Sequence, residues 1–324
     1  MNERFDIAVL GTGAWGTALA LLAAKAGRRA ALVGRDAGRV AELAGSRRNP
    51  RLPDAVLPPG LAVTASCPDA EILILCPPFQ HLRHLLARMP PGISPLVLAS
   101  KGVEAGTGML GPEIVAALHP GRPVAVLTGP NFAHEIAAGM PAAGIAATTD
   151  AALRASLLRA LATPGFRLYG SGDPMGAALA GAAKNVIAIA AGAVMGAALG
   201  ENARAALVTR GLAEIARLAP ACGGQGQTIA GLAGLGDLLL TCTGPASRNY
   251  AFGLAIGRGE APAALLARSA GVVEGAATAP ALLARAASHG IEMPITAAVV
   301  SLLEGRATLA ETMRGLLSRA VRDE

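Results

Sequence analysis

The chain has 324 residues, of which 52% are hydrophobic and 15% are charged, so it is long enough for two domains and too apolar for an intrinsically disordered protein. Lys and Arg outnumber Asp and Glu by 28 to 22, which gives a net charge of +6. The basic residues are scattered and aromatic residues make up only 2%, which argues against a nucleic-acid-binding surface and favours a site for phosphorylated small molecules.

Four cysteines, at positions 67, 76, 222 and 242, show no spacing typical of a metal site or a disulfide framework. Near the amino end, charged residues lead directly into the apolar run 7–10, which ends at a glycine and is too short for the core of a signal peptide. We therefore expect no bound metal, reduced thiols and a cytoplasmic location.

Residues 5 to about 170 alternate short apolar segments with helical stretches. The apolar segments are continuous and are bounded by Gly or Pro, a pattern typical of parallel strands that are buried on both faces. We predict strands at 5–10, 30–34, 72–76, 96–100, 124–127 and 144–147. Such strands in alternation with helices predict a Rossmann-type, doubly wound parallel α/β sheet.

A glycine-rich loop follows the first predicted strand. In Gly11-Thr-Gly13-Ala-Trp-Gly16, the first glycine permits a tight turn, the second lets a pyrophosphate approach the backbone, and the third lets helix and sheet pack closely. The amides and the dipole of the following helix attract the negative charge. The motif alone is weak evidence, but its place between a strand and a helix predicts dinucleotide binding; the alternative is a tight glycine turn.

Two charged residues follow the second predicted strand, where a dinucleotide site reads the ribose. Arg35 is suited to the 2′-phosphate of NADP, whereas Asp36 is suited to the 2′-hydroxyl of NAD. The pair leaves both cofactors open, with Arg35 favouring use of NADPH. The alternative is that both are solvated loop charges.

Polar residues also follow two later strands. Lys101 comes directly after the strand 96–100, and Gly129-Pro-Asn131 follows the strand 124–127. The carboxyl ends of strands in an open α/β sheet face the ligand crevice, so these residues are candidates for ligand contact. The five histidines are scattered, and we assign none of them a catalytic role.

From Asp173 onward the pattern is helical. Pro174 suits the first position of a long helix, and further helices are expected from Asn202, as the cap, and over 262–269, 275–289 and 295–304. The sequence therefore predicts a dinucleotide-binding domain over 1–172 and an all-helical substrate domain over 173–324.

The long helix is the one segment that resembles a membrane span. Its uncharged stretch, 186–200, is shorter than the roughly twenty residues that a span requires. Gly192, Gly196 and Gly200 recur every four residues, so the helix presents a smooth ridge that another helix or a cofactor can approach closely. We expect a buried helix and no membrane span.

Two charges interrupt apolar helical sequence and are candidates for catalysis. Lys184 lies among small apolar residues, where partial desolvation lowers the pKa of an amine and suits it to proton transfer. Asp237 is the only charge between Gly223 and Ser247, and Lys184 is its expected partner. The alternatives are that Lys184 extends to the surface and that Asp237 caps a helix.

The tripeptide Ser247-Arg248-Asn249 follows the turn Gly244-Pro245. A hydroxyl, a guanidinium and an amide together form a compact set of donors for a phosphate, and Arg can bind it through two nitrogens. The alternative is an ordinary polar loop.

These motifs together resemble the bacterial-type NAD(P)-dependent sn-glycerol-3-phosphate dehydrogenases over nearly the whole chain. The similar strings are GTGAWGTALA (11–20), ASKG (99–102), TGPNFAHEIAAGMP (128–141), GAAKNVIAIAAG (181–192), NARAALVTRGLAEIARL (202–218), AGLGDLLLTCTGPASRN (233–249), VVEG (272–275) and MPIT (293–296). The resemblance implies a Rossmann domain followed by a helical domain similar to that of the 6-phosphogluconate dehydrogenases.

The resemblance also implies roles for individual residues. Lys184 and Asp237 take the catalytic positions. The implied substrate-binding positions are Lys101, Gly129, Asn131, Lys184, Asp237, Ser247, Arg248 and Asn249. The implied cofactor-binding positions are Gly11, Gly13, Ala14, Trp15, Gly16, Arg35, Lys101, Ala133, Arg248, Val272 and Glu274. Ala14 and Asn131 stand where the family often has serine, so each lacks one hydroxyl.

The implied reaction is the interconversion of dihydroxyacetone phosphate and sn-glycerol 3-phosphate with NAD or NADP, which supplies phospholipid synthesis. Lys184 would give a proton to the oxygen of the ketone as hydride reaches its carbon. Two other functions stay open: a related 2-hydroxyacid, hydroxyisobutyrate or opine dehydrogenase, and a dinucleotide sensor without catalysis. A homodimer is the default expectation.

Overall fold

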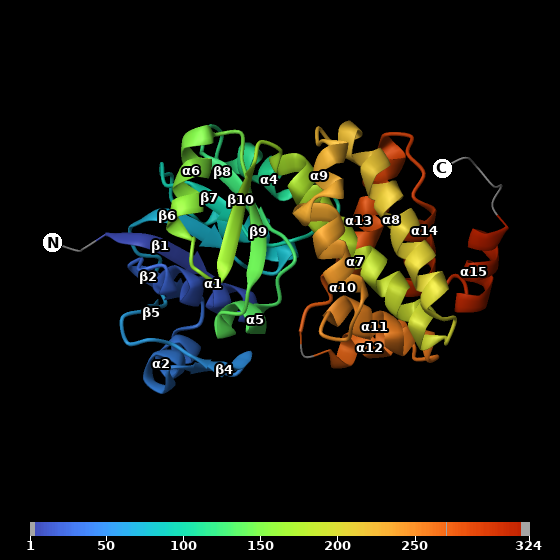
Figure 1. The fold of residues 1–324 in the computed structure, drawn as a ribbon, viewed down its shortest axis with the longest axis horizontal. Helices are drawn as coiled ribbons and strands as arrows, with labels where there is room; N and C mark the ends of the chain where they lie inside the picture. The colour runs from blue at the N-terminus through green and yellow to red at the C-terminus, as the bar shows by residue number, and fades with distance from the viewer. Residues whose placement is uncertain (1–3, 270, 319–324) are drawn as a thin grey trace. The chain divides into compact units, whose positions relative to one another are not determined.

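The computed structural model describes residues 4–269 and 271–318, drawn as a ribbon in Figure 1. The described chain divides into two compact units. The first unit takes in Met1–Lys101 and Gly111–Ala178, and the second unit takes in Gly102–Leu110 and Leu179–Glu324. The domain boundary predicted from the sequence, at residue 172, stays a prediction. The two units are defined by packing, and the short segment Gly102–Leu110 belongs to the second unit although it lies within the sequence of the first.

The first unit contains one large sheet whose strand order is β10-β9-β8-β7-β6-β1-β2-β5. Its strands are β1 (Phe5–Leu10), β2 (Ala30–Val33), β5 (Ala62–Thr64), β6 (Ala70–Leu75), β7 (Leu96–Leu98), β8 (Val124–Thr128), β9 (Ala142–Ala147) and β10 (Phe166–Ser171). From β5 to β8 all neighbours are parallel, which confirms the doubly wound parallel sheet.

The far edge of the sheet runs the other way. Strand β9 pairs with β8 in antiparallel fashion, and β10 then pairs with β9 in parallel. The strand predicted at 144–147 is β9, but the parallel direction expected for it is wrong, and strands β5 and β10 were not predicted. Strand β5 is only three residues long, and β10 carries Arg167 and Tyr169 on an edge where one face is solvated, so neither shows a continuous apolar run.

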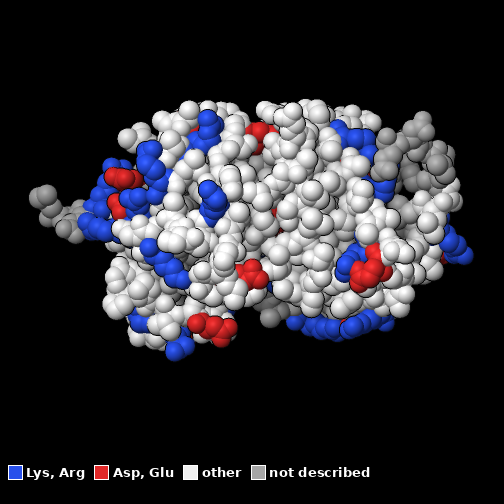
Figure 2. Space-filling view, viewed as in Figure 1, with Lys and Arg blue, Asp and Glu red and all other residues white. Residues whose placement is uncertain are grey.

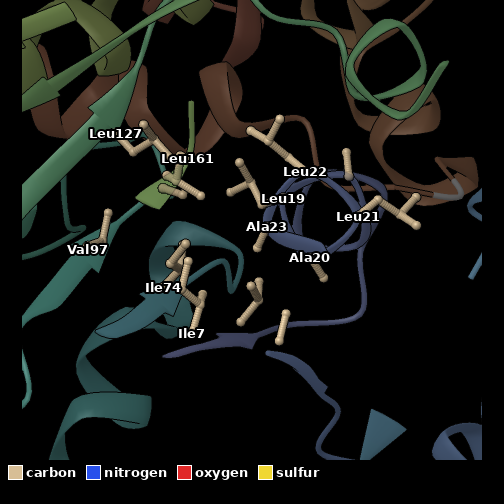
Figure 3. Packing of buried hydrophobic residues seen from close by; sticks show 14 of the residues in the cluster. Ile7, Leu19, Ala20, Leu21, Leu22, Ala23, Ile74, Val97, Leu127 and Leu161 are labelled. Carbon is tan, nitrogen blue, oxygen red and sulfur yellow. The ribbon is translucent and has the colours of Figure 1, made fainter. Parts of the chain in front are cut away.

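The helices of the first unit pack on this sheet through small and aliphatic side chains. They are α1 (Ala14–Lys25), α2 (Ala37–Ser46), the 3₁₀ turn Phe79–His81, α3 (Leu82–Ala87), α4 (Gly111–Leu118), α5 (Ala133–Ala138) and α6 (Ala151–Ala160). Figure 3 shows part of the core, in which Leu19 and Leu22 of α1 lie among Ile7, Ile74 and Leu127 from the strands. This core has few aromatic rings. The alanines on α1 are small, so the helix can lie close to the sheet.

A two-stranded antiparallel ribbon lies outside the main sheet. It is formed by β3 (Arg48–Asn49) and β4 (Leu52–Val56), and its register shifts between Arg48 and Asn49. The sequence analysis does not predict this ribbon, because its strands are short and mostly exposed.

The second unit is built from helices, as the sequence pattern predicts. They are α7 (Pro174–Gly196), α8 (Glu201–Ala221), α9 (Gly226–Ala230), the π-helical turn η2 (Leu232–Gly236), α10 (Asp237–Cys242), α11 (Arg248–Gly257), α12 (Pro262–Arg268), α13 (Glu274–Ser288), α14 (Pro294–Leu303) and α15 (Leu309–Leu317). The expected cap of α8 at Asn202 is wrong: the helix begins at Glu201, and Gly200, with φ +90°, is its N-cap.

Helix α7 is the hydrophobic centre of the second unit. By length and composition it could cross a membrane, but 89% of its most apolar window is buried inside the structure. Burial of this kind is typical of the core helix of a globular domain, which agrees with the expectation from the sequence.

Glycines bring α7 into backbone contact with α11. A Cβ added to Gly192 would lie 2.1 Å from the carbonyl oxygen of Tyr250, and one added to Gly253 would lie 2.0 Å from that of Ile189. The same closeness is found at Gly196 and Gly257. Gly192 and Gly196 of the predicted ridge therefore serve a helix, and this contact fixes where α11 lies relative to α7. The prediction is wrong for Gly200, which lies beyond the end of α7 and where an added Cβ would meet nothing within 4 Å.

Charged side chains are distributed in small groups. On the face drawn in Figure 2, Lys and Arg side chains form small groups, for example at the left and along the lower edge, and several of them lie beside Asp or Glu. This face shows no broad basic patch, as the scattered positions in the sequence predict.

Candidate functional site

The glycine-rich loop between β1 and α1 is held by close backbone contacts. Gly11 has φ +128°, and a Cβ there would lie 2.8 Å from the carbonyl oxygen of Cys76, at the end of the neighbouring strand β6. A Cβ on Gly16 would lie 2.0 Å from the carbonyl oxygen of Gly11. Only glycine therefore fits at these two positions, as the sequence motif predicts.

Gly13 differs from the other two glycines of the loop. It is the N-cap of α1, no side chain caps the helix there, and a Cβ on Gly13 would meet nothing within 4 Å. The first amides of α1 therefore adjoin open space, which is the arrangement that binds an anion at a helix N-terminus. The loop accordingly fits the pyrophosphate of a dinucleotide. Ala14 and Trp15 form the first turn of the helix.

Arg35 and Asp36, the two residues predicted to read the ribose, differ in their contacts. Arg35 is exposed and follows β2 after one glycine. Asp36 is the N-cap of α2, and its Oδ1 accepts a hydrogen bond from Arg39 N at 2.9 Å. One of its two carboxylate oxygens is therefore already used within the protein, whereas the guanidinium of Arg35 is exposed at the carboxyl end of the strand.

Lys101, Gly129, Asn131 and Ala133 follow the neighbouring strands β7 and β8. They lie at the same edge of the sheet as the glycine-rich loop, because these strands and β1 run parallel. Gly129 has φ +127°, and a Cβ there would lie 3.0 Å from Gly144 Cα. Among the described residues, the buried Oδ1 of Asn131 has no hydrogen-bond partner.

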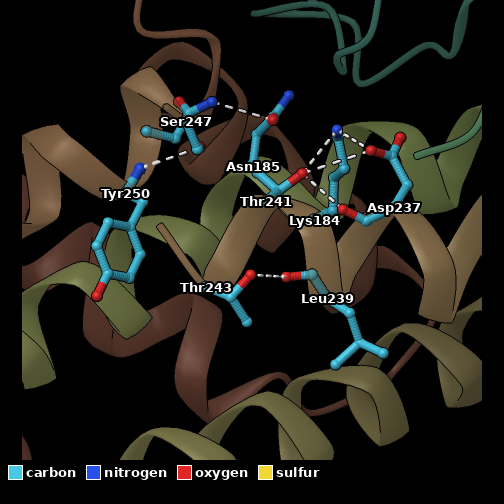
Figure 4. Close-up of polar contacts among 9 residues, drawn as sticks. Lys184, Asn185, Asp237, Leu239, Thr241, Thr243, Ser247 and Tyr250 are labelled. Atoms are coloured by element: carbon cyan, nitrogen blue, oxygen red, sulfur yellow. Dashed lines mark hydrogen bonds and ion pairs between the residues drawn. The ribbon is translucent and has the colours of Figure 1, made fainter. Parts of the chain in front are cut away.

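Lys184 and Asp237 form the centre of the candidate site in the second unit. Lys184 is 7% exposed and Asp237 is completely buried. The Nζ of Lys184 donates hydrogen bonds to Asp237 Oδ1 and, at 2.9 Å, to the hydroxyl of Thr241 (Figure 4). That hydroxyl donates its own hydrogen to the carbonyl oxygen of Asp237 at 2.6 Å. Since Thr241 gives its one hydrogen to that carbonyl, Lys184 is the donor in their bond.

The local fold explains why these side chains meet. The π-helical turn η2 ends directly before Asp237, and a Cβ on Gly234 within it would lie 2.0 Å from the carbonyl oxygen of Ile229. Turns of this type are found mostly at functional sites, because they turn a side chain out of the regular helical register. Thr241 lies one turn further along α10, on the same face as Asp237.

Cys242 lies next to this group, but its thiol is not a candidate nucleophile. Burial raises the pKa of Cys242 to about 12, and the charges of Lys184 and Asp237 act on it in opposite directions. A thiol of this kind stays protonated and unreactive near neutral pH. Among the described residues, no group of His, Cys, Asp or Glu is arranged to hold a metal ion.

The predicted phosphate site at Ser247-Arg248-Asn249 is the start of α11. Ser247 caps the helix, since its hydroxyl accepts a hydrogen bond from Tyr250 N at 3.3 Å. Arg248 is exposed in the first turn, and its guanidinium lies over Gly271, where a Cβ would be 2.8 Å from Nη1. A cation at a helix N-terminus opposes the helix dipole, so Arg248 is placed to meet an anion and not to stabilise the helix.

Asn249 joins three helices. Its Nδ2 donates to Asn185 Oδ1 on α7 at 3.0 Å, and its Oδ1 accepts from Gly275 N on α13 at 2.9 Å. Gly275 must be glycine, because a Cβ there would lie 2.5 Å from the carbonyl oxygen of Asn185. The predicted cofactor position Glu274 is the first residue of α13, and Val272, two residues earlier, is 41% exposed. Asn249 is thus a buried bridge between α7, α11 and α13.

Both halves of the chain match models of one protein family. Residues 6–154 match the N-terminal domain of NAD-dependent glycerol-3-phosphate dehydrogenase, and residues 173–314 match its C-terminal domain. The chain belongs to this family. The resemblance stated from the sequence is therefore confirmed.

Individual relatives agree with this assignment over their full lengths. The chain is 63% identical to glycerol-3-phosphate dehydrogenase [NAD(P)+] of Acidiphilium cryptum, with 100% of both chains covered. It is 47% identical to the enzyme of the same name from Gluconobacter oxydans, with 98% of each covered. Among solved structures, glycerol-3-phosphate dehydrogenase of Coxiella burnetii is similar at a TM-score of 0.92 and 36% identity, covering 98% of this chain and 99% of that one.

The structure adds Thr241 to the candidates that the sequence analysis names. Its position four residues after Asp237, as a hydroxyl in the apolar run Leu-Leu-Leu-Thr-Cys, is a signal that the sequence contains, since residues four apart share a helix face.

Proposed function

We propose that the chain is an oxidoreductase that interconverts dihydroxyacetone phosphate and sn-glycerol 3-phosphate with NAD(P). The observation that carries the proposal is the buried ammonium of Lys184, held by Asp237 and Thr241, in a chain of this family with an intact dinucleotide loop. When bound, the reduced nicotinamide supplies the hydride. The main function inferred from the sequence is favoured over both alternatives, because the named relatives are dehydrogenases of this one type.

Lys184 is the proposed proton donor. As the ketone carbon is reduced, its oxygen becomes an alkoxide, and the ammonium of Lys184 gives it a proton; in the reverse direction the neutral amine removes the proton from the alcohol. Asp237 and Thr241 act by holding the amine in place, and the carboxylate also stabilises the positive charge before transfer. Lys101 is a second proposed donor to the same oxygen.

Arg248 is the proposed direct contact of the substrate phosphate. Its guanidinium and the first amides of α11 both favour a bound anion. Ser247 and Asn249 hold this turn, since their side chains already bond to Tyr250 N, Asn185 and Gly275 N. The bond to Asn185 uses one hydrogen of the Asn249 amide, which leaves the other for the phosphate. Gly129 and Asn131 are proposed contacts for the remainder of the substrate.

The proposed cofactor site is the loop Gly11–Gly16 with Ala14, Trp15, Arg35 and Ala133, joined by Lys101, Arg248, Val272 and Glu274. Because Asp36 already caps α2, we favour NADPH, with its 2′-phosphate on Arg35. A cytoplasmic location, supply of phospholipid synthesis and a homodimer stay predictions.

The deciding experiment follows the absorbance of the reduced cofactor with purified protein and dihydroxyacetone phosphate, using NADPH and NADH in parallel. We expect turnover with the phosphorylated ketone and little with unphosphorylated dihydroxyacetone. Turnover confined to 2-oxoacids would instead favour the related 2-hydroxyacid or opine dehydrogenases. Binding of cofactor without turnover of any ketone would favour a dinucleotide sensor.

A further inference from the structure

Asn49 is a buried amide in the ribbon β3–β4, outside the main sheet. It is only 4% exposed, and every hydrogen of its carboxamide is used. The Nδ2 donates to the carbonyl oxygen of Thr12 at 3.0 Å and to the hydroxyl of Thr17 at 2.6 Å, while its Oδ1 accepts from Arg51 N at 3.0 Å. Thr12 lies within the glycine-rich loop, and Thr17 lies in the first turn of α1. One side chain therefore holds both ends of the phosphate-binding turn.

The bond to Thr12 fixes the direction of a loop amide. In a planar trans peptide, the carbonyl of one residue and the N–H of the next point in opposite directions. Asn49 holds the carbonyl of Thr12, so the N–H of Gly13 must point away from Asn49. The space beside Gly13 is open, because a Cβ there would meet nothing within 4 Å. The hydrogen bond from Asn49 to Thr12 O thus orients the Thr12–Gly13 peptide, whose N–H can meet an incoming anion.

The bond to Thr17 ties the helix to the loop. Thr17 is completely buried, and its backbone N–H donates to Gly13 O at 2.9 Å. Since the N-cap Gly13 has no side chain, the start of α1 lacks an ordinary capping group. Glycine also permits many backbone conformations, so a loop with three glycines needs an external support to stay in one of them. Asn49 supplies this support from the side.

The ribbon is itself fixed in place. Arg47 ends α2 with φ +54°, and its guanidinium donates to three carbonyl groups further along the segment: those of Leu57 at 3.3 Å, Leu61 at 2.8 Å and Pro58. In addition, Leu57 N donates to Arg47 O at 2.8 Å. The segment 47–61 is therefore a closed loop, and Asn49 is carried on a support that does not depend on the glycine loop.

We propose that Asn49 is a positioning residue of the cofactor site, which holds the Thr12–Gly13 peptide in the orientation that binds the pyrophosphate. It acts through the loop and need not touch the cofactor. The inference rests on the proposed function, since it requires that this loop binds NAD(P).

The test is the Kd of NADPH, measured by its fluorescence, for the wild-type chain and for Asn49→Asp. The aspartate keeps the Oδ1 that accepts from Arg51 N, but it cannot donate, and it places a carboxylate oxygen against Thr12 O. We expect a Kd about tenfold to a hundredfold weaker, the cost of breaking two buried hydrogen bonds. At saturating NADPH, kcat and the KM for dihydroxyacetone phosphate should stay near the wild-type values. Arg48→Ala, which changes an exposed side chain on the same ribbon, is the control and should bind normally.

Thr17→Val supplies an independent second variant, because it removes the acceptor hydroxyl and preserves the shape. It should weaken NADPH binding about threefold to tenfold with a Tm lowered by only a few degrees, and the double variant should cost less than the two single effects combined. A wild-type Kd in Asn49→Asp would overturn the inference, as would an equal loss in kcat and in both KM values. If the wild-type chain bound neither NADPH nor NADH, the proposed function itself would be rejected.

Discussion

The glycine-rich loop of the first unit and the Lys184 group of the second unit differ in the atoms that form them and in their burial. The loop is made of backbone, with open space beside Gly13 and a supporting amide at its side. The Lys184 group is made of side chains, which are almost completely buried and have their charges paired. A substitution in a backbone site can remove ligand affinity without a loss of protein stability. In a buried charge pair the same atoms support both stability and chemistry, so a substitution there should affect both. The experiments that follow test this difference.

Asp237→Asn should have the largest effect, because it leaves the ammonium of Lys184 buried without its counter-charge. Breaking a buried pair by removing one partner typically costs about 3–5 kcal/mol in the free energy of unfolding. Urea denaturation measures this loss. The matched control is the double variant Lys184→Met with Asp237→Asn, which removes both charges and should regain much of the stability. Equal stabilities of the single and double variants would contradict the pairing.

Lys184→Ala should lower kcat by about a hundredfold or more, the usual effect of losing a general acid. The binding of NADPH to the glycine loop should change little, since that site lies in backbone of the other unit. Steady-state kinetics with dihydroxyacetone phosphate provide the measurement. A variant with near-normal turnover would remove Lys184 from the proposed role.

Gly13→Ala tests the other half of the comparison. A methyl group at this position meets no protein atom, so the Tm should stay at the wild-type value. The same methyl would occupy the space through which a pyrophosphate approaches, and the Kd for NADPH should rise about tenfold or more. Gly16→Ala is the contrasting variant, because its Cβ would collide with Gly11 O and should destabilise the unit. Unchanged NADPH affinity in Gly13→Ala would show that the cofactor does not use this space.

Arg248→Ala should act mainly on substrate binding. The exposed guanidinium makes no hydrogen bond within the described part of the chain that its loss would break, so stability should hold while the KM for dihydroxyacetone phosphate rises about tenfold or more. Arg248→Lys keeps the charge but not the two-pronged geometry, and it should recover only part of the loss. An unaltered KM would reject Arg248 as the phosphate contact.

Glu214 provides the smallest test, since it is a buried carboxylate held by backbone amides instead of a cation. It accepts hydrogen bonds from Ile295 N at 2.6 Å and Thr296 N at 3.3 Å, yet burial outweighs them and raises its pKa. A raised pKa in the folded state means that stability is greatest below the ordinary value of about 4.5 and is lost as the pH rises through the folded pKa.

Glu214→Gln removes this titration. Between about pH 4.5 and 7 the wild-type chain should therefore lose more stability than the variant, by about 1.4 kcal/mol for each pH unit by which folding raises the pKa of Glu214. Urea denaturation at the two pH values measures the difference. Identical pH dependence in both chains would contradict the raised pKa of Glu214.

The sequence predicts most of the fold where apolar runs are continuous. Strand β1 has the predicted bounds, and the glycines at 11 and 16 are required by the contacts that the motif implies. The antiparallel direction of β9 was not predicted, because its apolar run is the same as that of a buried parallel strand. The edge strand β10 was not predicted, because its alternating burial leaves no apolar run.

The candidate site was predictable where charges are rare. Lys184 and Asp237 are single charges in apolar helices, and each needs a partner; the structure brings them together. The tripeptide 247–249 was less predictable, because a polar residue at a turn can cap a helix, bridge helices or bind a ligand. Ser247 caps α11, and Asn249 bridges three helices. Whether an isolated Ser or Asn caps a helix, bridges helices or binds a ligand depends on neighbours distant in sequence.

The backbone contact between α7 and α11 has a consequence for substrate selection. Lys184 is carried by α7 and Arg248 by α11, and the glycines that join the two helices leave no side chains between them that could repack. The backbone positions of Lys184 and Arg248 are therefore fixed relative to each other, and only their side chains can adjust to a ligand. A phosphate ester one carbon longer or shorter should fit the two side chains less well, because the helices that carry them cannot shift to follow it.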